Sequence, residues 1–296
     1  MSQWKGKTNA NLFGIKIFVF VLNNVGLGFA YFILRFVALY YFLFAWKSNK
    51  SSYFYFHKVL KFGKLKSLSS MYQNYYVFGQ TLLDKVALLS GVKTNFTIDH
   101  DGIENLDAIV AGGKGGILIS AHVGNWEIAG QLLNRLDTKF NVLMYENEHA
   151  NIKNYLDGVQ KNKNINIIPI KDGEMGHIIA LNNAFKNNEL LVLHGDRFRE
   201  GAPTLNTPFM GLDAYFPEGP FYLAAKFGVP VTYAFSMKET DSHYHFYASK
   251  PIEVKRERKP DAILHTLLGE YVVELEKMVK KYPTQWFNYY PFWKQQ

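Results

Sequence analysis

Short apolar runs alternate with helical patterns along most of this 296-residue chain, and this alternation restricts the possible folds more than any other feature. Runs rich in β-branched residues occur at 96–98, 116–120, 140–144, 165–170, 189–194, 229–235 and 243–249. Apolar residues at helical spacing occur at 126–136, 152–160, 175–186, 219–227 and 261–281. The alternation predicts an α/β fold, in which a central mixed, mostly parallel sheet is flanked by helices. The last two strands follow each other closely and are expected to be antiparallel.

Composition excludes several classes of protein. Hydrophobic residues make up 48% of the chain and charged residues 20%, so the whole chain cannot be intrinsically disordered. The absence of cysteine excludes disulfides, thiolate metal sites and a cysteine nucleophile. His243 and His245 share one face of a strand but lack a third ligand, so no metal site is expected. The net charge of +8 favours acidic partners or anionic lipids, and no motif indicates a nucleic-acid partner.

The N-terminal segment is the only strongly apolar part of the chain. Residues 27–46 contain a single charge, Arg35, and their length is about that needed to cross a ~30 Å hydrocarbon core. Lysines flank this stretch on both sides, which suits a segment that enters the membrane from the cytoplasmic face and stays there. A spanning helix, an in-plane anchor and a helix buried in a soluble core all fit. We therefore expect residues 1–50 to form a membrane-anchoring helical segment and residues 51–296 an α/β domain.

The most informative motif joins the end of a buried strand to the start of a helix at residues 115–127. His122 and Glu127 are five residues apart, which on a continuous helix would leave their side chains about 140° apart. They can meet only if the chain turns between them, and Gly124 is the residue able to make that turn. The motif lies at the carboxyl end of a strand, where open α/β sheets bind their ligands.

An imidazole beside a carboxylate is typical of general-base catalysis. Glu127 would accept a hydrogen bond from one nitrogen of His122, while the other nitrogen takes a proton from the nucleophile. No cysteine and no Gly-x-Ser-x-Gly sequence is present, so the nucleophile would be the second substrate. Backbone N–H groups at the helix start, near Gly124 and Asn125, could bind an oxyanion or a phosphate. The same spacing also fits a structural histidine next to a Glu that caps the helix.

A second polar block follows another buried strand, at residues 191–198. Asp196 and Arg197 lie at the carboxyl end of that strand and are expected to face the same crevice as His122. Arg197 could bind a phosphate or the carbonyl of a thioester, and Asp196 could position Arg197 or the acceptor. A surface turn held by a salt bridge is the alternative.

These blocks resemble one enzyme family. The sequence I-S-A-H-V-G-N-W-E at residues 119–127 is similar to the His-x4-Glu motif of the lipid A late acyltransferases, the lauroyl/myristoyl acyltransferase family. Residues 195–197, Gly-Asp-Arg, resemble the Gly-Asp-Arg/Gln motif of that family, and residues 208–231 also match it as a loop, a helix and a strand. The family is related to the glycerolipid acyltransferases, which carry His-x4-Asp, and the likeness covers nearly the whole chain.

The resemblance implies a membrane-bound enzyme on the cytoplasmic face of a bacterial inner membrane. Such an enzyme moves a fatty acyl chain from acyl carrier protein, or from a CoA thioester, to a hydroxyl of a glucosamine-based lipid. It needs no cofactor, because the thioester on 4′-phosphopantetheine is a co-substrate. His122 matches the catalytic base and Glu127 its partner acid. By the same likeness, substrate binding is expected at Gly124, Asn125, Asp196 and Arg197.

Two features leave the acceptor open. The family commonly carries an Arg after the strand that follows the catalytic helix, whereas this chain has Glu146 and Glu148 there. This acidic pair would repel a phosphorylated disaccharide, so an amino-lipid or pigment-lipid acceptor is an alternative. Residues 216–219 read like the Phe-Pro-Glu-Gly motif of glycerolipid acyltransferases, but their position predicts the start of the next helix. A basic, membrane-attached binding protein without enzymatic activity is the remaining alternative.

Overall fold

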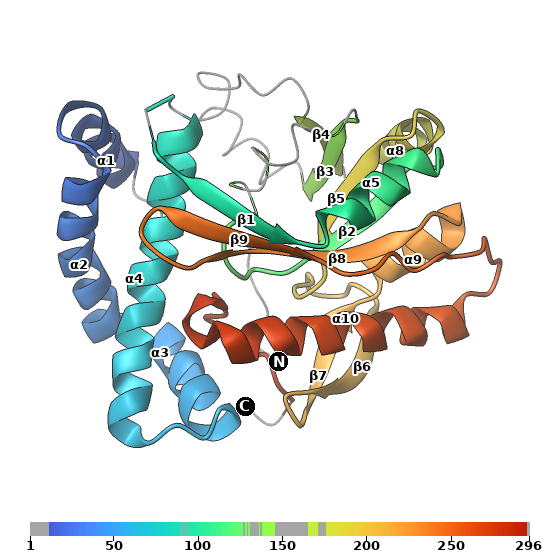
Figure 1. Cartoon of the computed structure of the whole chain (residues 1–296). Helices are drawn as coiled ribbons and strands as arrows, with labels where there is room; N and C mark the ends of the chain where they lie inside the picture. The colour runs from blue at the N-terminus through green and yellow to red at the C-terminus, as the bar shows by residue number, and fades with distance from the viewer. Residues whose placement is uncertain are drawn as a thin grey trace.

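The computed structural model describes residues 12–89, 91–92, 94–126, 128, 130, 136, 138–145, 165–170 and 176–294. The molecule is built on a seven-stranded sheet with strand order β1-β9-β8-β2-β5-β3-β4 (Figure 1). The strands are β1 (Thr97–Asp101), β2 (Gly116–Ser120), β3 (Phe140–Tyr145), β4 (Ile165–Ile170), β5 (Leu190–His194), β8 (Val231–Lys238) and β9 (His243–Ala248). Neighbouring strands are parallel except β8 and β9. The predicted mixed, mostly parallel sheet and the antiparallel last pair are thus confirmed.

Apolar layers cover both faces of the sheet. Every residue of β2 is buried, with Ile117 and Ile119 in one hydrophobic cluster and Leu118 in another. The first cluster includes residues of α8 (Gly176–Lys186), α9 (Gly219–Phe227) and α10 (Asp261–Lys281), and the second includes residues of α5 (Ile103–Ala111). In Figure 1, α10 runs below the sheet. Helical spacing correctly predicted six residues of the buried face of α10, which are Leu264, Leu267, Leu268, Tyr271, Leu275 and Met278.

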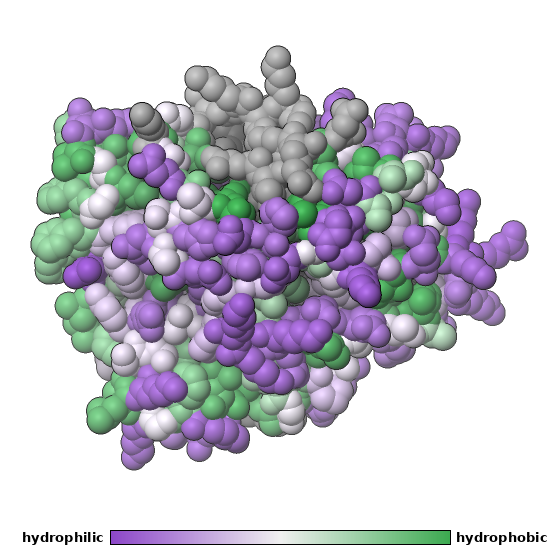
Figure 2. Space-filling view, viewed as in Figure 1, coloured by the Kyte–Doolittle hydropathy of each residue, from purple (hydrophilic) through white to green (hydrophobic). Residues whose placement is uncertain are grey.

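Helices precede the sheet along the chain. They are α1 (Leu12–Asn24), α2 (Leu27–Phe44), α3 (Trp46–Tyr53), the π-helical segment η1 (Phe54–Val59) and α4 (Lys64–Leu89). In the interface between α2 and α4, Tyr31 and Leu34 pack with Leu83 and Ala87. The other face of α2 is exposed and apolar, and the hydrophobic surface over α1 and α2 is green at the left of Figure 2. In the described part of the chain, α2 alone is long and apolar enough to cross a membrane, and 22% of it is buried.

The fold contains a hairpin that the sequence did not predict. Strands β6 (Thr204–Phe209) and β7 (Leu212–Pro217) form an antiparallel hairpin, whereas the sequence predicted a loop from Pro208. The two residues of the turn, Met210 and Gly211, have φ angles of 53° and 82°. Turns of this kind usually carry Asn, Asp or Gly at both positions. Because Met210 is unusual in such a turn, the sequence did not indicate a hairpin at this position.

The hairpin completes the aromatic core beside α10. Phe209 and Phe216 have fully buried side chains, and the ring of Phe209 packs edge-on against Trp286. The next helix, α9, begins at Gly219, as the sequence predicted. The helix expected at 126–136 is described only in part, with Trp126, Ile128 and Gly130 helical, and the helix expected at 152–160 lies outside the described residues.

Candidate active site

His122 and Asp196 follow two neighbouring parallel strands. In the pairing of β2 with β5, Ser120 lies opposite His194. His122 and Asp196 each come two residues after these partners, so the register carries both to the same level at the carboxyl edge of the sheet. The Nδ1 atom of His122 lies 2.7 Å from Oδ1 of Asp196. This contact is the centre of the candidate site.

Asp196 is a buried carboxylate surrounded by donors. Its Oδ2 accepts hydrogen bonds from the backbone N–H of His122 at 3.0 Å and from Nε1 of Trp286 at 3.4 Å. Burial alone would raise the pKa of Asp196, but His122 and then Arg197 lower it, and the net pKa lies below the usual value. An ionised carboxylate can only accept, so Nδ1 of His122 carries a proton. In the neutral ring, Nε2 then holds the lone pair, and the side chain of His122 is 29% exposed.

His194 forms a wall of the site that the sequence analysis did not assign. The centre of its ring lies 4.3 Å from that of His122. Burial, followed by the electrostatic effect of His122, lowers the pKa of His194 to about 3. His194 is therefore neutral at physiological pH and adds no competing positive charge. Its place immediately before the Gly-Asp-Arg sequence is the signal that could have identified it.

The loop that carries His122 makes the expected turn at Gly124. The φ angle of Gly124 is 57°, and a Cβ atom there would lie 2.0 Å from the carbonyl oxygen of Ser236. The N–H of Gly124 donates to the carbonyl of Gln285 at 3.0 Å, and the N–H of Asn125 donates to that of Ser236 at 2.7 Å. A close backbone approach therefore requires glycine at this turn.

Asn125, expected to bind substrate, is buried against α4. Its Nδ2 donates to the carbonyl of Thr81 at 3.0 Å and lies 3.5 Å from the hydroxyl of Tyr244. The side chain thus attaches the loop that carries His122 to a helix that packs against α2. In the described part of the chain, the side chain of Asn125 therefore anchors this loop to α4.

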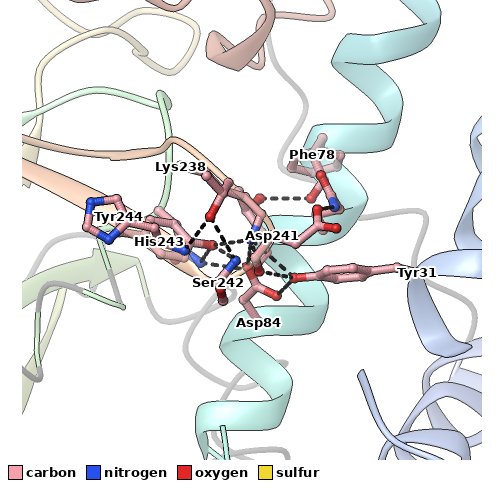
Figure 3. A network of polar contacts seen from close by, with 12 residues as sticks. Tyr31, Phe78, Asp84, Lys238, Asp241, Ser242, His243 and Tyr244 are labelled. Atoms are coloured by element: carbon pink, nitrogen blue, oxygen red, sulfur yellow. Dashed lines mark hydrogen bonds and ion pairs between the residues drawn. The ribbon is translucent and has the colours of Figure 1, made fainter. Parts of the chain in front are cut away.

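A buried polar network surrounds this attachment (Figure 3). Lys238, at the end of β8, contacts Oδ2 of Asp84 at 2.6 Å and donates to the carbonyl of Asp241 at 2.9 Å. The hydroxyls of Tyr31 and Tyr244 also donate to Asp84, whose side chain is fully buried. Figure 3 shows that Tyr31 approaches from α2 and Asp84 from α4, so the network joins both N-terminal helices to the sheet.

The C-terminal segment covers the loop and contacts Arg197. The guanidinium of Arg197 donates to the carbonyl of Phe287 at 2.6 Å, and the N–H of Phe287 donates to the carbonyl of His122 at 2.9 Å. Val123 and Trp286 pair as an isolated antiparallel bridge. The sequence did not predict that this segment contacts the site. The contacts use backbone groups, which every residue type has, so no particular residue type indicates them.

Glu127 lies outside the described residues. The predicted contact between Glu127 and His122 therefore stays a prediction. The described geometry brings His122, Gly124 and Asn125 together with Asp196 and Arg197 at one edge of the sheet.

The two histidines of β9 are paired with carboxylates. Nε2 of His245 lies 3.1 Å from Oδ2 of Asp101, and Nε2 of His243 lies 3.5 Å from Oδ2 of Asp99. Among the residues that the structure describes, no three side chains are grouped so that they could bind a metal ion.

Part of this chain is similar to known proteins. Two curated proteins named phosphatidylinositol mannoside acyltransferase, from the Mycobacterium tuberculosis strains ATCC 25618 / H37Rv and CDC 1551 / Oshkosh, are each 26% identical to this chain over 129 residues. The match covers 43% of this chain and 40% of theirs, so it spans about two-fifths of the length of these relatives.

Among solved structures, the chain is similar to the 1-acyl-sn-glycerophosphate acyltransferase PlsC from Thermotoga maritima. The two share 14% sequence identity with a TM-score of 0.40, over 86% of this chain and 99% of that one. The sequence profile of the bacterial lipid A biosynthesis acyltransferases matches residues 66–295, which is well over half of the chain. The chain therefore belongs to the bacterial lipid A biosynthesis acyltransferase family, a family of enzymes that transfer acyl groups.

Proposed function

We propose that this protein moves a fatty acyl chain from a thioester to a hydroxyl group of a membrane glycolipid, with His122 as the general base. The observation that carries the proposal is the 2.7 Å contact between Nδ1 of His122 and the buried carboxylate of Asp196. That contact fixes the tautomer in which Nε2 accepts a proton, and the ring is partly exposed. Membership of the family supports acyl transfer as the chemistry.

In the proposed reaction, Nε2 of His122 takes the proton of the acceptor hydroxyl as the oxygen attacks the carbonyl carbon of the thioester. The carbon–sulfur bond then breaks, and the departing thiolate takes the proton back from the imidazolium. The products are an ester and a free thiol, with His122 neutral again. Asp196 stabilises the imidazolium between these steps, which is the role that the sequence predicted for Glu127.

Arg197 is suited to the negative charge that develops on the carbonyl oxygen. The N–H groups of Gly124 and Asn125 already donate to backbone carbonyls, so they are poorly placed to bind an oxyanion. One nitrogen of Arg197 donates to Phe287, but its Nε is buried and has no hydrogen-bond partner in the described part of the chain. We infer that this Nε–H faces the thioester carbonyl or a phosphate of the substrate.

Charge and the names of the relatives support the donor and the acceptor that we propose. A net charge of +8 suits an acidic acyl carrier protein, whose 4′-phosphopantetheine presents the thioester, and a CoA thioester is the alternative. The curated relatives are named for a mannosylated phosphatidylinositol, which is a glycolipid with many hydroxyls. A hydroxyl of a glycolipid such as a lipid A precursor is therefore the acceptor that we propose.

The N-terminal helices and the family indicate association with a membrane. We propose the cytoplasmic face of a bacterial inner membrane, with α2 lying in the plane of the interface. Tyr31, Leu34 and Ala38 bury one face of α2, against an α4 that carries the buried Asp84. A spanning α2 would bring polar α4 residues into the hydrocarbon region, where charges and unpaired polar groups are costly.

An amino-lipid or pigment-lipid acceptor is the second candidate. Glu146 and Glu148 favour it in the sequence, although they lie outside the described residues. Comparison of lipid extracts from cells with and without the gene decides between the two. An unchanged profile of amino-lipids and pigments, together with a glycolipid that lacks one acyl chain, would exclude this candidate.

The central test replaces the base. In His122→Ala we expect kcat to fall by about 10²–10⁴-fold, because the acceptor hydroxyl loses its proton acceptor. The assay incubates membranes with labelled acyl carrier protein and identifies the acylated lipid by mass spectrometry. His100→Ala, which replaces an exposed histidine on β1, is the control and should retain full activity. Full activity of a folded His122→Ala protein would refute the proposal.

A further inference from the structure

An apolar pocket that plays no part in the proposed chemistry lies among the N-terminal helices. It has a volume of about 380 Å³, within the range of small-molecule sites. Most of its lining is apolar or aromatic and comes from α2, α3 and α4: Phe42, Leu43, Trp46, Tyr53, Leu68 and Met71. A pocket with such a lining is suited to a hydrocarbon chain.

The two remaining lining residues, Asn49 and Lys50, are polar. The amide of Asn49 is engaged at both ends, because its Nδ2 donates to the carbonyl of Phe42 at 2.7 Å and its Oδ1 accepts from Tyr75 at 3.0 Å. Lys50 is the other polar residue and bears a positive charge. A peptide would bring backbone amides into this pocket, where they would find few partners. An alkyl chain has no such need.

The pocket opens on a surface that is suited to a membrane. Trp46 and Leu43, on its lining, are 78% and 49% exposed, and Phe44 and Leu65, each close in the chain to a lining residue, are also exposed. Exposed apolar patches of this kind mark sites of interaction with ligands or membranes. A lipid chain leaving the bilayer would therefore reach the pocket without crossing a polar surface.

Charge on this part of the chain favours an anionic headgroup. The first acidic residue of the whole sequence is Asp84, so residues 1–83 contain nine lysines and Arg35 and no carboxylate. These residues bear a charge of +10, whereas the complete chain bears +8 and the remainder therefore −2. The lysines concentrate at 47–66, along α3 and into α4, and Lys50 lines the pocket itself. Basic clusters beside an apolar surface attract anionic lipids.

We propose that this pocket binds one acyl chain of an anionic phospholipid, with the phosphate of the headgroup near Lys50. The inference rests on the membrane association in the proposed function but not on the chemistry at His122. It gives the protein a lipid-binding site separate from the site of acyl transfer. The lipid would hold the α2–α3–α4 corner at the membrane surface.

The test uses phosphatidylglycerol with a photoreactive diazirine near the end of one acyl chain, mixed into phosphatidylcholine vesicles with the purified full chain. After irradiation, labelled peptides are identified by mass spectrometry. We expect labels to concentrate on residues 42–53 and 68–71. The same diazirine on phosphatidylcholine should label them several-fold less, and Lys50→Gln should reduce the difference between the two lipids.

A matched pair of variants separates the pocket from the general membrane surface. Leu68→Trp fills the pocket and should reduce labelling several-fold, whereas Leu82→Trp, on the same helix, should leave it unchanged. Leu68 and Leu82 are 42% and 47% exposed. Labels spread evenly over the exposed face of α2, or equal labelling of both variants, would overturn the proposal. Formation of a dimer that excludes the lipid would also overturn it.

The result of the labelling experiment does not depend on whether the proposed reaction is correct. His122→Ala should retain the labelled pocket while losing acyl transfer, so the two proposals can fail separately. An active His122→Ala protein with a labelled pocket refutes only the proposed function. An inactive His122→Ala protein with no concentrated label refutes only the lipid site.

Discussion

At the scale of the residue, Asp196 sets both the orientation and the proton position of His122. One of its oxygens contacts Nδ1 of His122, and the other accepts two N–H donors. Because both oxygens are engaged and buried, the carboxylate has little freedom to rotate. The imidazole is therefore held with Nε2 as its basic nitrogen, which is the arrangement a general base needs.

Asp196→Asn should separate orientation from charge. The N–H donors of His122 and Trp286 will hold the amide oxygen of the new residue, so its NH₂ group will face Nδ1. The ring must then accept at Nδ1 and carry its proton on Nε2, the wrong tautomer for a base. We expect kcat to fall at least about 10²-fold with little change in KM.

Steady-state kinetics and nitrogen NMR of the histidines measure this effect. Asp101→Asn, which changes the exposed carboxylate of a His–Asp pair on the sheet edge, is the control and should retain activity. A normal kcat in Asp196→Asn, with His122 still protonated on Nδ1, contradicts the assigned role.

At the scale of the element, α4 connects the N-terminal helices to the loop that carries His122. Along its length it packs against α2, contributes Asp84 to the buried network and provides the carbonyl of Thr81 that binds Asn125. The helix thus contacts both the proposed membrane anchor and the loop that follows His122. Asp84 and Thr81 are polar, and a helix that served only as an apolar anchor would not need them.

Lys238→Met tests the most buried link in this connection. The substitution leaves Asp84 without its cation in a site from which water is excluded, so we expect the free energy of unfolding to fall by about 3 kcal/mol or more. The double variant Asp84→Leu/Lys238→Met should recover much of this loss, because no unpaired charge remains.

Denaturant titrations measure these changes. Lys277→Met breaks an exposed pair with Glu274 and should change stability by less than about 1 kcal/mol. If Lys238→Met is as stable as the unmodified protein, the buried pair does not stabilise the junction.

At the scale of the whole molecule, the sequence predicted the local secondary structure well. It predicted less well which strands pair and which distant residues come into contact. The alternating pattern and the spacing in α10 predicted the layers, because strand and helix periods are local properties. The pairing of β2 with β5 depends on strand order, which no local pattern contains. The contact of His122 with Asp196 follows from that pairing, so sequence reasoning expected only a shared crevice. The β6–β7 hairpin was missed because Met210 is an unusual turn residue.

The stability of the whole molecule should decline in acid. His194 has a pKa of about 3 when folded and an ordinary value near 6.5 when unfolded. Between these values the unfolded chain binds the proton and the folded chain does not, so stability decreases as the pH falls from about 6.5 towards 3. Asp196, whose folded pKa is depressed, adds a further loss at lower pH.

His194→Gln should therefore flatten the fall in Tm between pH 6.5 and 3. His265→Gln, which replaces an exposed histidine on α10, is the matched control and should keep the slope of the unmodified protein. Thermal unfolding across this pH range measures both, and identical slopes in the two variants would show that His194 does not titrate as described.

The placement of His122 and Asp196 two residues beyond paired positions of β2 and β5 has an evolutionary consequence. Side chains that are aligned by strand register inherit the stiffness of the sheet rather than that of the connecting loops. Changes in length elsewhere in the chain can then accumulate without separating the two side chains. If the proposed reaction holds, a lineage could in this way exchange one acceptor for another while the pair of side chains proposed to move the proton stayed intact.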